Sequence, residues 1–180
     1  MKYALTWQAR AIRADGASDW FPAQVPGNVQ RDYGAYMNWG DISVGENVTL
    51  FRQTEGYTWE YRAALDYAAV EGETAVLVFE GVDYLFDVLL DGQIALSHEG
   101  MFSWVEIPLA GGEREVMVRI HPHPKREGAQ FEDRQQADAC VKPPVCDEWD
   151  WHPRMLVSGI WQEAYVQTRH ADFIRRCEPF

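Results

Sequence analysis

The sequence predicts an all-β fold, an antiparallel β-sandwich of about eight short strands joined by long loops. Apolar and polar side chains alternate over residues 58–62, as on a half-buried strand. Asp91-Gly92 lies between two apolar runs, which is a strong hairpin signal because a type I′ turn needs positive φ at both central positions. No helical period is sustained anywhere, so two packed sheets are the natural way to bury the strands.

The expected elements follow from the amino end. Leu5 and Trp7, two positions apart, belong to a first strand. Residues 20–34 contain two prolines and two glycines and are expected to form an irregular loop with room for one helical turn. Further strands are expected at 58–62, 75–79, 84–90, 93–96, 102–109, 115–120 and 159–168. The continuous apolar run 75–79 predicts burial on both faces. In 58–62 the alternation places Trp59 and Tyr61 opposite Glu60 and Arg62, and in 115–120 it places Val116, Val118 and Ile120 on one face.

Two loops are long enough to suggest function. Residues 35–56 and 121–148 have no strand pattern, although a short helix fits 133–139. Loops longer than about 15 residues are uncommon in compact domains unless they bind or move something. We therefore expect the functional residues in these loops or beside them.

Composition limits the classes of partner. The 180 residues, 47% of them hydrophobic, suit a single domain over 1–180 with a real core. A net charge of −12 disfavours nucleic acid and anionic membrane, and it suits a neutral ligand such as a sugar. Cys140, Cys146 and Cys177 have no metal-site spacing. Free thiols, or a Cys140–Cys146 pair across a loop, are both open, and without a signal-peptide run we expect a cytoplasmic location.

Other candidate sites are weaker. His121 and His123 have the spacing of a metal-binding pair, but exposed loop histidines explain them as well. Asp41, Glu46 and Asn47 form a candidate structural Ca²⁺ site, with ordinary loop polarity as the alternative. No other cofactor or metal is expected.

Six segments, in order, resemble glycoside hydrolase family 2, and its β-mannosidase-like members most. The decisive one is Glu148-Trp149-Asp150-Trp151-His152-Pro153-Arg154 followed by Ser158-Gly159-Ile160-Trp161, which is similar to the family's Trp-Asp-Trp-Gly-Pro-Arg … Gly-Ile-Trp. His152 replaces the usual Gly. The others are Val25-Pro26-Gly27-Asn28-Val29, Trp59-Glu60-Tyr61-Arg62, Phe79-Glu80-Gly81-Val82-Asp83, Val88-Leu89-Leu90-Asp91-Gly92 and Gly100-Met101-Phe102. Together they run from about residue 20 to about residue 168.

The resemblance implies a jelly-roll of the galactose-binding type, the amino-terminal sugar-binding domain of a β-mannosidase- or β-galactosidase-like enzyme that hydrolyses O-glycosyl bonds in carbohydrate metabolism. Its partners would be carbohydrate and the enzyme's catalytic barrel and immunoglobulin-like domains. The family's Trp-Asp-Trp loop reaches into the barrel's active site. Carried over, Asp150 is the candidate sugar contact, Trp149 and Trp151 are its packing or stacking neighbours, Arg154 is an orienting charge, and His152 completes the substrate-binding set.

No catalytic residue is expected in this chain itself. A retaining glycosidase needs two carboxyl groups about 5–5.5 Å apart, and in this family both belong to a (β/α)₈ barrel, which takes about 250 residues. Glu148 and Asp150 would lie about 7 Å apart if they shared a strand face. Two other functions remain open: a free-standing carbohydrate-binding module with its site in loops 20–56 or 121–154, and a scaffold or interaction domain without a ligand, in which Asp150 is structural.

Overall fold

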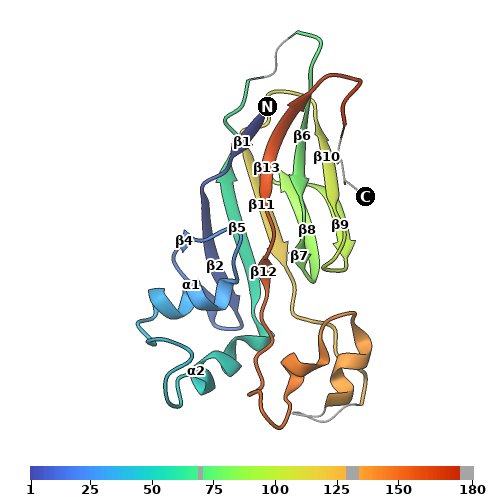
Figure 1. Cartoon of the computed structure of the whole chain (residues 1–180). Helices are drawn as coiled ribbons and strands as arrows, with labels where there is room; N and C mark the ends of the chain where they lie inside the picture. Colours follow the sequence, from blue (N-terminus) through green and yellow to red (C-terminus); the bar gives the residue numbers. More distant parts are fainter. Residues whose placement is uncertain (69–70, 129–133, 175–180) are drawn as a thin grey trace.

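The computed structural model describes residues 1–68, 71–128 and 134–174, and there the fold is an antiparallel β-sandwich with helical segments at one end (Figure 1). One sheet has the order β1-β13-β6-β10 and the other β3-β2-β5-β11-β8-β9, with β4 paired to β2. β7 and β12 form a short ladder of their own. Every pairing is antiparallel, which confirms the predicted fold class.

The strands are β1 (Lys2–Ala4), β2 (Trp7–Arg13), β3 (Gly16–Ala17), β4 (Phe21–Ala23), β5 (Thr58–Ala64), β6 (Thr74–Phe79), β7 (Val82–Asp83), β8 (Leu85–Leu90), β9 (Gln93–Glu99), β10 (Val105–Leu109), β11 (Glu115–Ile120), β12 (Gly159–Ile160) and β13 (Ala164–Arg169). The helical segments are α1 (Val29–Tyr36), α2 (Val48–Arg52) and the 3₁₀ turns η1 (Gln53–Gly56), η2 (Arg134–Ala139) and η3 (Pro144–Asp147).

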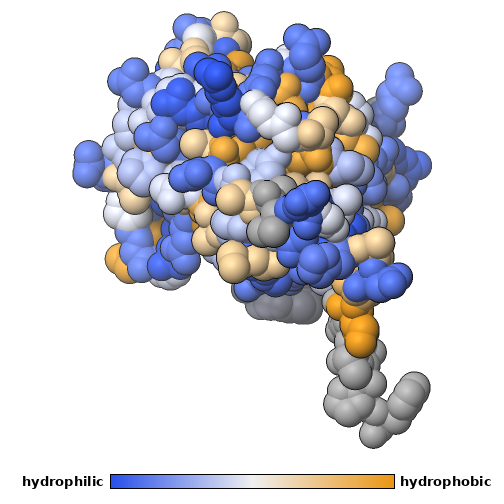
Figure 2. Space-filling view, turned by 90° about the horizontal axis from the view of Figure 1, so that it is seen from above, coloured by the Kyte–Doolittle hydropathy of each residue, from blue (hydrophilic) through white to orange (hydrophobic). Residues whose placement is uncertain are grey.

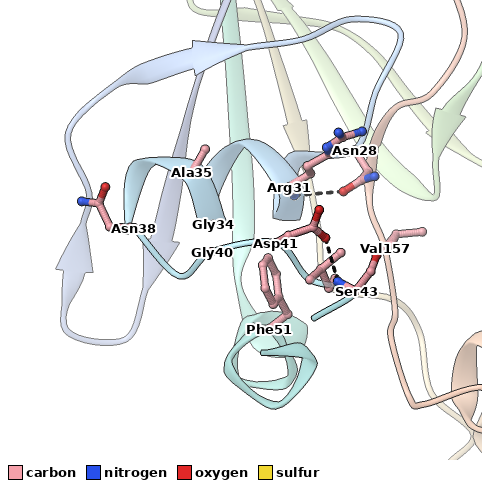
Figure 3. Close-up of a pocket in the computed structure, with 11 residues that line it drawn as sticks. Asn28, Arg31, Gly34, Ala35, Asn38, Gly40, Asp41, Ser43, Phe51 and Val157 are labelled. Carbon is pink, nitrogen blue, oxygen red and sulfur yellow. Dashed lines mark hydrogen bonds between the residues drawn. The ribbon is translucent and has the colours of Figure 1, made fainter. Parts of the chain in front are cut away.

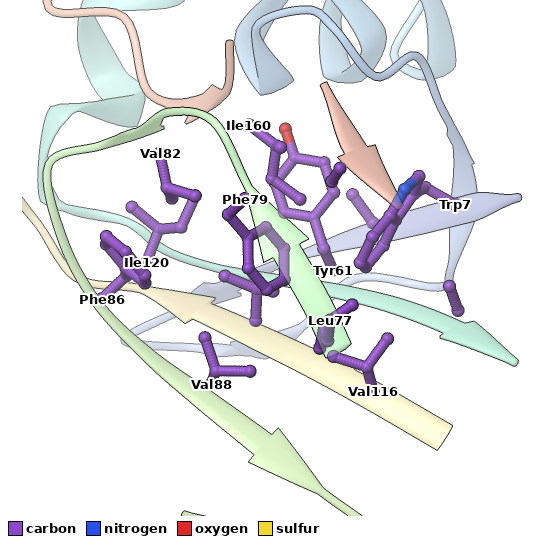
Figure 4. Close-up of a cluster of buried hydrophobic side chains, with 14 of the residues drawn as sticks. Trp7, Tyr61, Leu77, Phe79, Val82, Phe86, Val88, Val116, Ile120 and Ile160 are labelled. Carbon is purple, nitrogen blue, oxygen red and sulfur yellow. The ribbon is translucent and has the colours of Figure 1, made fainter. Parts of the chain in front are cut away.

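The core fills the space between the two sheets (Figure 4). Leu77 and Phe79 of β6 meet Tyr61 of β5 and Trp7 of β2, and Ile160 of β12 closes one end. Burying such large apolar side chains stabilises a fold by about 1.5–3 kcal/mol each. The predicted inward face of β11 is confirmed, because Val116, Val118 and Ile120 are all fully buried.

Strand β6 is buried on both faces, as its apolar run predicts. Leu77 and Phe79 point into the main core, whereas Val76 and Val78 form a second cluster with Tyr165 on the other side of the sheet. β6 lies between β13 and β10, so neither edge of the strand is open.

The Asp91-Gly92 hairpin is also confirmed. Asp91 has φ 46° and Gly92 has φ 81°, and the turn joins β8 to β9. The Asp91 carboxylate accepts the backbone N–H groups of Arg114 and Glu115 at 3.0 and 2.9 Å, so the turn is also tied to the start of β11.

The predicted strands at both ends of the chain were wrong in extent. Leu5 lies outside any strand, because β1 and β2 belong to different sheets and the chain crosses between them there. The expected strand 159–168 is likewise divided into β12 and β13, with a bend at residues 161–163.

The expected loops 20–34 and 35–56 are more regular than predicted. They contain β4, α1, α2 and η1. Asn28 caps α1, since its side-chain oxygen accepts the Arg31 N–H at 3.0 Å. The prolines and glycines near Asn28 are typical of a loop, so the start of helix α1 at this residue was not predicted.

Glu60 departs from the simple alternation of β5, because it is buried although it lies opposite Trp59 and Tyr61. Arg10 and Arg119, from the two neighbouring strands, both donate to its carboxylate. Trp20 lies against the guanidinium groups of Arg10 and Arg62. This paired cluster covers the outer face of the sheet and removes the cost of burying one charge alone.

The two ends of the sandwich differ. The helical segments gather at one end, and the opposite end is mostly hydrophilic, with hydrophobic residues only in small patches (Figure 2). In the described part of the chain, no helix has the length and apolar character needed to span a bilayer.

Candidate functional site

The segment 147–154 lies at the helical end of the sandwich, after η3 and near α2 (Figure 1). Arg52 at the end of α2 lies 3.9 Å from Glu148, between Arg Nη2 and Glu Oε1. We call residues 147–154 the Trp-Asp-Trp loop. The fold therefore presents this loop next to helices that come from a distant part of the sequence.

A tight turn forms the tip of the Trp-Asp-Trp loop. The backbone groups of Trp149 and His152 make two reciprocal hydrogen bonds, each 3.0 Å long. Asp150 and Trp151 lie between them and are exposed, Trp151 by 75%. The rings of Trp149 and Trp151 lie 5.5 Å apart at an angle of 54°. The turn thus projects one carboxylate beside two indole rings.

Arg154 holds the loop from its buried side. Its side chain is fully buried and donates to Glu55 through Nε (2.7 Å) and Nη2 (2.9 Å). It also donates to the side-chain oxygen of Gln136 at 2.8 Å and to the carbonyl oxygen of Asp147 at 3.2 Å. Two-pronged pairs of this kind fix geometry as well as charge. Arg154 therefore holds the loop in place and does not face the solvent side where a ligand would lie.

The pKa values of two carboxyl groups near Arg154, those of Glu55 and Asp147, are shifted in opposite directions. Burial acts to raise the pKa of Glu55, but hydrogen bonds from Arg154 and Lys125 outweigh it and hold the pKa below its ordinary value. Burial raises the pKa of Asp147, and the nearby charge of Arg154 only partly opposes this. Glu55 is thus the carboxylate that most firmly keeps its charge as the partner of Arg154.

His152 occupies the position where the family pattern has glycine. Its backbone closes the tip turn, and its side chain is partly buried, with Nδ1 inaccessible and without a hydrogen-bond partner in the described residues. Its φ is not positive, so the turn does not need glycine here.

A buried polar network supports the chain that leaves the loop. Gln30 of α1 accepts the Ser158 N–H at 2.9 Å and donates to the carbonyl oxygen of Leu156 at 3.1 Å. Lys142 and His123 both reach the carbonyl oxygen of Val157, at 3.0 and 2.9 Å. Residues 155–158 are therefore held from α1 and from the 121–148 segment at once.

The same network contains a buried ion pair. Lys142 donates to Asp83 of β7, and both side chains are almost completely inaccessible. His123 Nδ1 lies 4.0 Å from the other oxygen of Asp83, and burial lowers the pKa of His123. Sequence reasoning missed Lys142 and Asp83, because nothing in the chain marks them as partners across 59 residues.

A pocket of about 810 Å³ lies beside this end of the sandwich (Figure 3). Helix α1 and residues 38–43 form its walls, and Phe51 and Val157 also line it. Gly34 makes room for Phe51, since a Cβ there would approach the Phe51 ring to 2.5 Å. Among its polar lining residues are Asn28, Arg31 and Asp41.

The residues considered above as metal ligands form hydrogen bonds within the protein. Asp41 accepts the Ser43 N–H at 2.8 Å, and its carbonyl oxygen accepts the side-chain amide of Asn47 at 2.8 Å. His121 pairs with Asp87 at 2.8 Å, whereas His123 is buried in the network above. The described residues contain no group of three or more potential metal ligands.

The cysteines that the structure describes are free. Cys140 and Cys146 form no disulfide, and burial raises the pKa of both thiols. Cys177 lies outside the described residues.

Comparison with known proteins places this architecture in a family. Residues 7–162 match the model described as "Glycosyl hydrolase 2 galactose-binding domain-like". The chain belongs to this family. The galactose-binding-like domain is 25% identical over 183 residues to beta-mannosidase B of Aspergillus fumigatus, covering 92% of the domain and 22% of that protein. It is 26% identical over 164 residues to beta-mannosidase B of Emericella nidulans, covering 82% of the domain and 20% of that protein.

Solved structures agree. The domain matches the crystal structure of a β-D-mannosidase from Dictyoglomus thermophilum with a TM-score of 0.76 and 25% identity, over 94% of the domain and 22% of that chain. A β-glucuronidase of Faecalibacterium prausnitzii shares the fold at a TM-score of 0.57 and 17% identity, over 95% of the domain and 32% of that chain. The domain thus spans about a fifth of the length of the curated relatives it matches.

The five predicted substrate-binding residues all lie between positions 149 and 154, but they have different places in the loop. Trp149, Asp150 and Trp151 form the exposed part of the loop, His152 closes its turn, and Arg154 lies beneath it. No ligand tests their contact with sugar, so that role stays a prediction.

Proposed function

We propose that this domain belongs to a β-mannosidase-like glycoside hydrolase and supplies its Trp-Asp-Trp loop to a sugar pocket that a catalytic barrel completes. The observation that carries the proposal is the contrast within the loop. Asp150 and Trp151 are exposed at a hydrogen-bonded tip, whereas Arg154 is buried and bound to Glu55. An exposed carboxylate on a rigid support is the arrangement that a binding site requires.

The chemistry of the tip suits a sugar. An ionised carboxylate accepts hydrogen bonds from hydroxyl groups, and such charge-assisted bonds are stronger than neutral ones. Indole rings cover the apolar C–H face of a pyranose while their N–H groups remain available for hydrogen bonds. Asp150 would accept from sugar hydroxyls, and Trp149 and Trp151 would exclude water around it.

The catalytic carboxyl groups would come from the barrel. The described residues form a β-sandwich, and the carboxylate nearest to Asp150 in sequence, Glu148, is directed to Arg52. Supporting this division of labour, the relatives named beta-mannosidase are about five times longer than the domain that matches them.

An assembled enzyme tests the proposal. This domain would replace the matching fifth of the Dictyoglomus thermophilum β-D-mannosidase, and kcat/KM would be measured on an aryl β-mannoside. We expect Asp150→Ala to lower kcat/KM about 10- to 100-fold, the cost of one hydrogen bond to a charged group. Asp66→Ala, an exposed aspartate in the 65–73 connection, is the matched control and should leave kcat/KM unchanged. Equal effects of the two substitutions would refute the role of the loop.

The pocket between α1 and residues 38–43 favours a second candidate, a free-standing carbohydrate-binding module. Asn28, Arg31 and Asp41 line it beside the ring of Phe51. Titration of the 180-residue chain with mannose, galactose and glucuronate, followed by ¹H–¹⁵N NMR, separates the two functions. Shifts at the pocket or loop with sub-millimolar affinity would favour a module, and unchanged loop resonances at high millimolar sugar would favour a loop that needs the barrel.

A further inference from the structure

A second aromatic hollow, of about 390 Å³, lies outside the Trp-Asp-Trp loop. It is lined by Glu80, Phe102, Trp104, Trp161 and Gln162. These residues come from three connections, between β6 and β7, between β9 and β10, and between β12 and β13. None of them belongs to loop 147–154, so the hollow is a separate feature.

Two of its aromatic rings form a rigid corner. The rings of Phe102 and Trp161 lie 5.8 Å apart at 82°, and Phe102 is 61% exposed. Trp161 donates its indole N–H to the carbonyl oxygen of Met101 at 2.9 Å. A Cβ at Gly81 would come within 2.7 Å of the Trp161 indole, so only glycine lets the ring lie this close to the backbone. Packing therefore fixes Trp161, and Phe102 presents an open ring beside it.

Glu80 and Gln162 add polar groups to the lining of the same hollow. One oxygen of Glu80, Oε1, accepts the Tyr165 hydroxyl at 3.1 Å and lies 3.9 Å from Lys2 Nζ. The other, Oε2, has no hydrogen-bond partner in the described residues, and neither does the side-chain amide of Gln162. The hollow thus offers free hydrogen-bond acceptors and donors next to an exposed aromatic ring.

We propose that this hollow is a second carbohydrate-binding site, which takes a neutral pyranose unit of an oligosaccharide. The sugar ring would lie on Phe102 against the edge formed by Trp161, and its hydroxyl groups would bond to Glu80 Oε2 and the Gln162 amide. An aromatic platform with a few converging polar groups is the usual composition of a small-ligand site. The Glu80 carboxylate favours neutral sugars over uronic acids, because a second carboxylate would be repelled.

This site would hold one sugar unit of an oligosaccharide outside the Trp-Asp-Trp loop, and it goes beyond the proposed function of the loop. The two can be tested separately because no residue is shared. A shallow, open site that lies on one ring is expected to bind weakly, with Kd on the order of 1 mM.

The test is a ¹H–¹⁵N NMR titration of the 180-residue chain, including the tryptophan indole N–H signals. The probes are β-1,4-linked mannotriose and cellotriose, with galacturonic acid as the charged comparison. We expect saturable shifts at residues 80–82, 101–104 and 161–162 with the neutral sugars and none with galacturonic acid. Phe102→Ala should weaken binding about tenfold, and Glu80→Gln should weaken it for neutral sugars while reducing discrimination against galacturonic acid.

Control variants distinguish sugar binding in the hollow from sugar binding at the Trp-Asp-Trp loop. Asp150→Ala and Trp151→Ala should leave the affinity of the hollow unchanged, even if the proposed role of the loop is wrong. Phe102 is exposed, so its replacement should not unfold the chain, and the dispersion of the spectrum checks this. No shifts at saturating sugar, shifts confined to residues 149–154, or equal affinity in Phe102→Ala would each overturn the proposal.

Discussion

Arg154 and Glu55 are joined by two hydrogen bonds, Nε to Oε1 at 2.7 Å and Nη2 to Oε2 at 2.9 Å, across 99 residues of sequence. This pair connects the Trp-Asp-Trp loop to the 3₁₀ turn that precedes β5, one of the central strands of the sandwich. The position of the exposed Asp150 therefore depends on a buried contact that lies below it.

Breaking this pair should destabilise the whole fold. Arg154→Lys cannot reproduce the two-pronged contact. Arg154→Met would remove that contact and the bond to Gln136, and it would leave Lys125 as the charged partner of Glu55. For Arg154→Met we expect a loss of about 3 kcal/mol in the free energy of unfolding, the lower end of the range for breaking a buried pair, measured by urea denaturation. Arg31→Met, at an exposed position, should change it by less than about 0.5 kcal/mol. A small effect of Arg154→Met would show that the pair does not anchor the loop.

The pair should also make stability depend on pH. Because the folded-state pKa of Glu55 is lowered, its contribution is complete above the unfolded pKa of about 4.3 and is lost as the pH falls through the folded value. The stability difference between the wild type and Glu55→Gln should therefore be constant near neutral pH and shrink below about pH 4.3. The raised pKa of Asp147 gives a pH dependence of stability with the opposite sign. Because Asp147 is present in both the wild type and Glu55→Gln, its contribution largely cancels in the difference between them. Urea melts at pH 7 and pH 3.5 measure the difference, and equal values at both would contradict the assignment.

Lys142 and Asp83 form the second buried contact beneath this end of the sandwich. Lys142→Met leaves the Asp83 carboxylate buried without its partner and should cost about 3–5 kcal/mol, whereas Lys142→Met combined with Asp83→Leu should recover much of the loss. Lys2→Met removes an exposed pair with Glu163 and should cost less than about 1 kcal/mol. If the double variant were as unstable as the single one, the buried charge would not be the cause.

Gly34 determines how closely Phe51 packs on α1. In Gly34→Ala the added Cβ would meet the Phe51 ring at 2.5 Å. We expect about 1–3 kcal/mol of destabilisation, although alanine favours a helix by about 1 kcal/mol. Thermal unfolding of both variants measures the effect, and Gly56→Ala, which has open space for the added Cβ, should be nearly neutral. A more stable Gly34→Ala would mean that Phe51 moves aside at little cost.

The sequence predicted those parts of the fold that depend on local pattern. Alternation predicted the inward faces of β5 and β11, and Asp91-Gly92 predicted its hairpin because positive φ is a local demand. The buried position of Glu60 could not be predicted, since its two arginine partners lie on the strands on either side. Helix α1 was missed although Asn28 supplies a cap, because Pro26 and Gly27 next to it are typical of a loop.

For the candidate site, the Trp-Asp-Trp segment can be recognised in the sequence, and the exposure of Trp149, Asp150 and Trp151 agrees with a binding loop. Their contact with sugar stays a prediction. That Arg154 lies beneath them could not be known, because burial depends on Glu55 and Gln136, which only the folded chain brings to it.

We propose that Asp150 hydrogen-bonds a sugar hydroxyl. A thermodynamic cycle that combines the Asp150→Ala substitution with the removal of single hydroxyl groups from the substrate tests this contact most directly. In the assembled enzyme, kcat/KM would be measured for wild type and Asp150→Ala on a β-mannoside and on its monodeoxy analogues. We predict one hydroxyl whose removal costs the wild type about 10- to 100-fold but costs Asp150→Ala almost nothing, because the bond is already absent. If every hydroxyl mattered equally in both enzymes, Asp150 would not contact the sugar.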